Sequence, residues 1–216
     1  MSDFLEEIIL PESFKPLFIG ISHYLINLNY KWRFYQELFL EKDNSLILMH
    51  TAPMFFFAIE QSLRNDIILS ICRLSDPERV KNDVNLSLAT LINNTEPINK
   101  VNDLYEEFKE NSKFFRKCRN KLIAHNDLEV FNDKSILIPL LDKEKVDKSL
   151  LLSEKILNLI AQRYNKNTQI LFSLLFIGGV DSLLHWLSMG IKYHQENIAL
   201  LKKGIIPPYF NKQQIG

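Results

Sequence analysis

The chain has 216 residues, and its 26 Lys and Arg residues balance 26 Asp and Glu residues, so its formal net charge at pH 7 is zero. Hydrophobic residues make up 46% of the sequence and charged residues 24%, which is typical of a globular protein with a sizeable core. Proteins that coat DNA or RNA without specificity usually carry a basic excess. The balance therefore argues against that class and restricts any nucleic-acid contact to a local site.

The sequence gives no sign of a disulfide framework, a metal site or a membrane span. Cys72 and Cys118 lie far apart, and no HExxH motif or paired cysteine cluster is present. The apolar runs 46–59 and 170–180 fall short of the ~20 residues that cross a bilayer, and the acidic N-terminus lacks the basic start of a signal peptide. We expect a soluble, cytoplasmic protein with no cofactor, no bound metal and no membrane partner.

Helical periodicity dominates the chain. It predicts helices over residues 14–27 and 30–41, a long helix from an Asn44-Ser45 cap to about Leu74, and further helices over 86–92, 98–124, 145–164 and 180–201. Pro53 either kinks the long helix or marks its true start. Residues 77–87 are predicted to be a loop, and residues 136–140 a short extended piece.

These elements predict an all-α fold. Residues 1–140 are expected to form one helical bundle. Residues 141–216 are expected to form additional C-terminal helices, arranged as a hairpin, that pack on the bundle or form a surface for a partner. The sequence shows no internal repeat and no low-complexity linker.

The segment from Arg119 to Asp127 combines an arginine, an adjacent amide and a histidine at a predicted helix end. Arginine is a permanent cation that binds phosphate oxygens in pairs, and histidine transfers protons near pH 7. RNA supplies its own nucleophile, the 2′-hydroxyl. Arg119 is therefore a candidate to stabilise the transition state and His125 a candidate general acid or base, with Asn120 orienting the phosphate or the imidazole. This chemistry needs no metal.

Helix geometry does not align this pair within one regular helix. Residues six apart are rotated by about 120° and separated by about 9 Å along the axis. Arg119 and His125 can meet if the helix ends before His125, if the arginine stem reaches across, or if a second copy of the chain supplies one of the two groups.

A purely structural interpretation also accounts for the charges. Basic residues near a helix C-terminus complement its dipole, and His125 could act as a cap. The same helix carries acidic residues, so its charged face is also typical of a solvated surface with ion pairs one turn apart. The basic residues before Arg119 are the candidates for an RNA contact: Lys113, Arg116 and Lys117.

The Arg119-Asn120 pair and His125 resemble the arginine–polar–histidine signature of the HEPN superfamily, named for higher eukaryotes and prokaryotes nucleotide-binding. The flanking sequences 123–127 and 70–77, which read Ile-Ala-His-Asn-Asp and Ser-Ile-Cys-Arg-Leu-Ser-Asp-Pro, are similar to the AbiU-like abortive-infection branch. The resemblance covers roughly residues 10 to 130.

The resemblance implies an up-and-down helical bundle that forms a homodimer, with the two motifs facing a shared cleft. It implies a metal-independent endoribonuclease of bacterial antiphage or toxin-like defence, with RNA as substrate and an antitoxin or other defence protein as a partner. The residues to which it assigns roles are Arg119 and His125 as the catalytic pair, Asn120 beside them, and Arg73, Asp76, Lys121 and Asp127 in support. Two alternatives stay open: a non-catalytic HEPN-like module that binds a protein or a nucleotide, and a purely structural dimerisation role.

Overall fold

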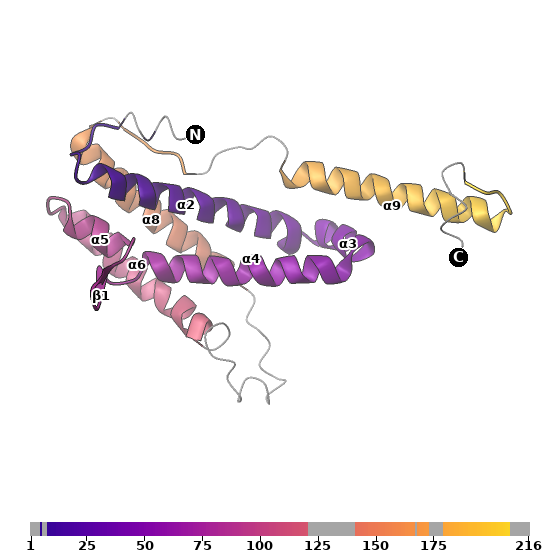
Figure 1. Ribbon diagram of the computed structural model, residues 1–216, viewed down its shortest axis with the longest axis horizontal. Helices are drawn as coiled ribbons and strands as arrows, with labels where there is room; N and C mark the ends of the chain where they lie inside the picture. The colour runs from indigo at the N-terminus through magenta and orange to yellow at the C-terminus, as the bar shows by residue number, and fades with distance from the viewer. Residues whose placement is uncertain (1–4, 6–7, 121–140, 167, 173–178, 208–216) are drawn as a thin grey trace. The chain divides into compact units, whose positions relative to one another are not determined.

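The computed structural model describes residues 5, 8–120, 141–166, 168–172 and 179–207. Helices make up most of this part, and its strands are two residues long (Figure 1). The predicted all-α fold is confirmed. Lys121, His125, Asp127 and the extended piece predicted at 136–140 lie outside the described residues.

The first two predicted helices form one element. Helix α2 spans Lys15–Tyr35 and continues into a π-helical segment, η1, over Gln36–Leu40. The predicted break near residue 28 was wrong because the buried stripe continues through it: Leu25, Leu28 and Trp32 are all buried. The side chain of Asn29 donates to the carbonyl of Leu25 one turn earlier, at 3.1 Å, so it satisfies a group of its own helix.

The long helix predicted after residue 44 is divided at Ala52. Helix α3 spans Lys42–Thr51 and α4 spans Pro53–Leu74. Ala52 has φ −147° and ψ 71°, outside the helical region, as expected for a residue that precedes proline. Of the two roles predicted for Pro53, the structure therefore shows the second, the start of a helix.

The predicted loop at 77–87 contains a small hairpin. Strands β1, Arg79–Val80, and β2, Asp83–Val84, pair antiparallel with Arg79 opposite Val84. Lys81 turns the chain with φ 55°. Helix α5, Leu88–Asn93, follows, and Ser87 caps it by accepting from the backbone N–H of Thr90.

The chain divides into two compact units. Unit 1 comprises Met1–Arg33 and Gln61–Leu175, and unit 2 comprises Phe34–Glu60 and Phe176–Gly216. Each unit contains residues from both sides of position 140. The helices that remain to be introduced are α6 over Asn99–Cys118, α8 over Lys143–Tyr164 and α9 over Val180–Lys202.

The core of unit 1 is centred on the packing of α6 against α8. Phe108 and Phe115 of α6 are fully buried, as are Ile156 and Ile160 of α8. Polar contacts also join the two helices. Asn111 donates to the backbone carbonyl of Lys145 and to Ser149 Oγ, both at 2.8 Å, and Lys148 pairs with Glu107 at 2.7 Å.

Helix α2 joins the same core through a polar contact to α8. The indole N–H of Trp32 donates to Asp147 Oδ1 at 2.6 Å. The ring of Trp32 is itself buried. Helix α8 is therefore an integral layer of unit 1.

Unit 2 is smaller and has an apolar core of its own, formed by Leu38, Leu48, Phe56, Val180 and Leu184. Helix α9 packs on α3 here, whereas α8 packs on α6, so the two C-terminal helices predicted to form a hairpin belong to different units. The first turns of α4 leave Met54, Phe55 and Phe57 77%, 60% and 56% exposed. Among the described helices, none combines the length and the apolar character that a bilayer crossing needs.

Candidate functional site

The candidate site begins where α6 ends. The buried stripe of α6, which includes Val101, Phe108 and Phe115, ends at Cys118. Arg119 keeps right-handed helical backbone angles, φ −55° and ψ −50°, and with Asn120 it enters a wider, π-helical turn. The regular α-helix therefore stops before the predicted end at Ala124. Such wide turns occur often at functional sites.

Asn120 holds the guanidinium of Arg119. Nε and Nη2 of Arg119 donate to Asn120 Oδ1 at 3.1 and 3.0 Å, and the pair is exposed to solvent. A guanidinium has five N–H donors, so two are engaged by the amide and three are available to an incoming anion. Asn120 thus orients the arginine. Its predicted role of orienting a phosphate or an imidazole stays a prediction.

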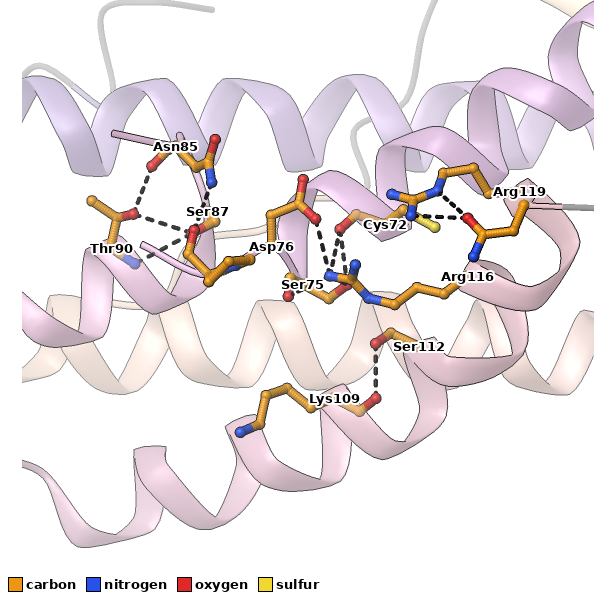
Figure 2. Close-up of polar contacts among 12 residues, drawn as sticks. Cys72, Ser75, Asp76, Asn85, Ser87, Thr90, Lys109, Ser112, Arg116 and Arg119 are labelled. Atoms are coloured by element: carbon orange, nitrogen blue, oxygen red, sulfur yellow. Dashed lines mark hydrogen bonds and ion pairs between the residues drawn. The ribbon is translucent and has the colours of Figure 1, made fainter. Parts of the chain in front are cut away.

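Arg116 connects α6 to the end of α4. Its Nη2 donates to the carbonyl of Ser75 at 2.7 Å, to Ser75 Oγ at 2.9 Å and to Asp76 Oδ1 at 3.0 Å (Figure 2). The carbonyl of Cys72 accepts a longer contact of 3.4 Å. The last carbonyls of a helix lack N–H donors within the helix and lie at the negative end of its dipole. The guanidinium of Arg116 supplies both hydrogen-bond donors and a positive charge at this end of α4.

The remaining upstream residues differ in their surroundings. Asp76 pairs with Arg116, and both side chains are partly buried, 27% and 31% exposed. Arg73, on the last turn of α4, is exposed to solvent. Of the predicted RNA contacts, Lys113 pairs with Glu110 one turn earlier on α6, and Lys117 is exposed. The structure therefore engages Arg116 within the protein and leaves Lys113 and Lys117 on the solvated face.

Two thiols lie beneath this site. Cys72 and Cys118 are 1% and 7% exposed and are not joined to one another. Burial raises the pKa of both, that of Cys72 to about 11 even though the charges of Arg119 and Arg116 oppose the shift. Figure 2 shows Cys72 at the end of α4, among the contacts of Arg116. Both thiols stay protonated near neutral pH, so neither is an activated nucleophile.

The raised pKa of Cys72 makes stability fall at high pH. Below pH 9.0 the thiol is neutral in the folded and unfolded chains, whereas between 9.0 and about 11 only the unfolded chain loses the proton. We expect Cys72 to contribute a loss of about 2–3 kcal/mol of unfolding free energy across this interval. Urea titrations at several pH values should show a flatter profile for Cys72→Ala. An identical slope in the variant would contradict the assignment.

Comparison with known families identifies the group to which the chain belongs. The family model for AbiU2, a HEPN family, matches residues 11–171. The chain belongs to the AbiU2 family. No curated protein and no solved structure gives a match.

The AbiU2 match begins just before α2 and extends past the end of α8. It therefore reaches beyond the segment near residue 130 where the sequence resemblance ends. Helix α8, which packs on α6, is therefore part of the AbiU2 domain. Within the matched residues, Arg119 and Asn120 follow directly after the end of α6.

The structure thus brings together four of the predicted residues, Arg116, Asp76, Arg119 and Asn120, at the ends of α4 and α6. Sequence reasoning missed Ser75, whose carbonyl and hydroxyl both accept from Arg116. The available signal was the helix stop, since Ser-Asp-Pro directly follows the last residue of α4. Within the described residues, no group of three His, Cys, Asp or Glu side chains is arranged to hold a metal ion.

Proposed function

We propose that this AbiU2-family protein is an endoribonuclease that cleaves RNA without a metal ion. The observation that carries the proposal is the guanidinium of Arg119, held by Asn120 in a solvent-exposed contact at the end of α6, within the segment that resembles the HEPN signature. An arginine fixed at a helix end and open to solvent is suited to binding a phosphodiester.

The proposed reaction uses the 2′-hydroxyl of the RNA as nucleophile. The 2′-oxygen loses its proton and forms a bond to phosphorus, the bond from phosphorus to the 5′-oxygen breaks, and the 5′-oxygen takes up a proton. His125 would move one of these protons, and Arg119 would stabilise the charge on the non-bridging oxygens. The products would be a 2′,3′-cyclic phosphate and a 5′-hydroxyl.

We also propose that the active form is a homodimer. Arg119 and His125 are six positions apart and would not share a face of one regular helix, so a second copy could supply the missing group. An apolar surface suited to self-association is present in unit 2, where Met54, Phe55 and Phe57 are more than half exposed. Exposed apolar patches of this kind are typical of interaction sites.

In the cell, we propose that this activity belongs to abortive infection or toxin-like defence and acts on cytoplasmic RNA. An uncontrolled ribonuclease would harm its host, so the proposal includes an antitoxin or another defence protein that restrains it. Lys121 and Asp127 would support the motif from within its own segment.

The second candidate function is a non-catalytic module that binds a protein or a nucleotide. Two observations favour it. The net charge is zero, and two of the three cations predicted to bind RNA, Arg116 and Lys113, pair with carboxylates of the protein itself. Such a module would bind its ligand and leave RNA intact.

The deciding experiment is incubation of the purified protein with total cellular RNA in EDTA, followed by analysis of the new ends. We expect 2′,3′-cyclic phosphate ends from the wild type and from a matched Arg163→Ala control, which loses only an exposed ion pair with Glu96. We expect no new ends from His125→Ala. Intact RNA with the wild type would favour the binding module, and equal cleavage by His125→Ala would remove His125 from the mechanism.

A further inference from the structure

Arg116 is placed to control the arginine of the motif without touching RNA. It precedes Arg119 by three residues on α6, a spacing that puts both side chains on one side of the helix. Figure 2 shows both arginines beside Cys72 in the last turn of α4. Arg116 faces that turn and bonds to it, whereas Arg119 bonds only to its neighbour Asn120 among the described residues.

The contacts of Arg116 lie further along α6 than the polar contacts that join α6 to α8. Upstream, Glu107 and Asn111 join α6 to α8. In the described part of the chain, Arg116 is the residue of α6 nearest to Arg119 whose side chain makes a polar contact with another helix end. Its Nη2 reaches four acceptors contributed by Cys72, Ser75 and Asp76 (Figure 2).

We propose that Arg116 is a positioning residue, held by Asp76 and Ser75, that fixes the end of α6 on the end of α4 and thereby sets the position of Arg119. This inference rests on the proposed ribonuclease function. Asp76, which the sequence places only in a supporting role, is then the counter-ion that keeps Arg116 in this orientation.

The surroundings of Arg116 argue against an RNA-binding role. Its charge is already neutralised by Asp76, and a phosphate would have to replace this carboxylate and the carbonyl and hydroxyl oxygens of Ser75. Lys117, the adjacent residue, is exposed, and within the described part of the chain it makes no ion pair that a phosphate would have to replace. Binding of a phosphate to Lys117 or Arg119 therefore costs less free energy than binding to Arg116.

The test is a double-mutant cycle on Arg116→Ala and Asp76→Ala, read out by turnover and by binding of an RNA whose 2′-hydroxyls are replaced by hydrogen. We expect each single variant to lower kcat by about 10- to 100-fold, because a small displacement of a positioned group has that effect. The double variant should be no worse than the singles. The Kd for the uncleavable RNA and its salt dependence should change by less than about twofold.

Two further variants make the cycle specific. Arg116→Lys should recover part of the lost rate, because all four contacts come from one nitrogen and an ammonium has three donors. The control is the same cycle on Lys109 and Glu106, an exposed ion pair within α6. It should leave kcat unchanged.

Two results would overturn the proposal. One is unchanged turnover in both Asp76→Ala and Arg116→Ala, the variants that remove the ion pair. The other is weaker RNA binding with a reduced salt dependence in Arg116→Ala alone, which would make Arg116 a phosphate contact.

If the wild type does not cleave RNA, the ribonuclease proposal fails. Amide hydrogen exchange then shows whether the positioning role of Arg116 fails as well. Faster exchange at residues 117–120 in Arg116→Ala and Asp76→Ala, with unchanged exchange at residues 101–108, would keep the positioning role although the ribonuclease proposal fails. Unchanged exchange at 117–120 would remove the positioning role as well.

Discussion

Arg119→Ala is expected to lower the rate of RNA cleavage by about 10²–10³-fold, the usual loss when one charged or hydrogen-bonding group at a transition state is removed. Among the described residues, its hydrogen bonds go to Asn120 in a solvent-exposed contact, so its loss should leave the fold intact. Arg119→Lys should recover only part of the rate, because an ammonium cannot bind two phosphate oxygens as a planar guanidinium does. The measurement is single-turnover cleavage of a labelled RNA, with thermal unfolding as the check on folding.

Mixing two inactive variants tests the dimer in the same assay. If the site combines Arg119 of one copy with His125 of the other, a mixture of Arg119→Ala and His125→Ala should regain part of the wild-type rate, because mixed dimers contain one complete site. Two sites each built within one copy would give no recovery. Full activity of Arg119→Ala alone would contradict the proposed role of Arg119 in stabilising the transition state.

Phe108→Ala is expected to destabilise the protein by about 3–5 kcal/mol, the range for removing a buried phenyl ring and leaving a cavity. Phe108 is fully buried on α6, and α8 packs against the same helix. The neighbouring face offers a control in Phe114, a half-buried ring 5.6 Å from the ammonium of Lys145. Phe114→Ala should cost about 1–2 kcal/mol. Urea unfolding followed by circular dichroism would measure both, and equal losses would contradict the packing described here.

Much of the fold could be predicted from the sequence because its long helices carry regular apolar stripes. The failures lie where local signals compete with packing. The prediction of separate helices over 14–27 and 30–41 placed a break near Leu28, but Leu25, Leu28 and Trp32 continue one buried stripe through it. At Pro53 the local signal predicted either a kink or a helix start, and the non-helical backbone of Ala52 shows that a helix starts there.

The candidate site was less predictable because its contacts depend on residues distant in sequence. The motif itself is a short local pattern, so Arg119 and Asn120 could be found directly. Arg116 could not be distinguished from Lys113 and Lys117, since all three are cations on one helix. Only the packing of α6 against the end of α4, about forty residues earlier, gives Arg116 its acceptors. The two-unit division was equally hidden, because each unit combines segments from both halves of the chain.

The place of α8 in unit 1 has a consequence for how the protein is made. Synthesis proceeds from the N-terminus, so the ribosome releases α6 and the Arg119 motif before α8. Until Lys143–Tyr164 has emerged, Phe108 and Phe115 lack the apolar surface that covers them, and Asn111 lacks both of its acceptors. A nascent chain that already contains the whole motif therefore still lacks the layer that holds α6 in place.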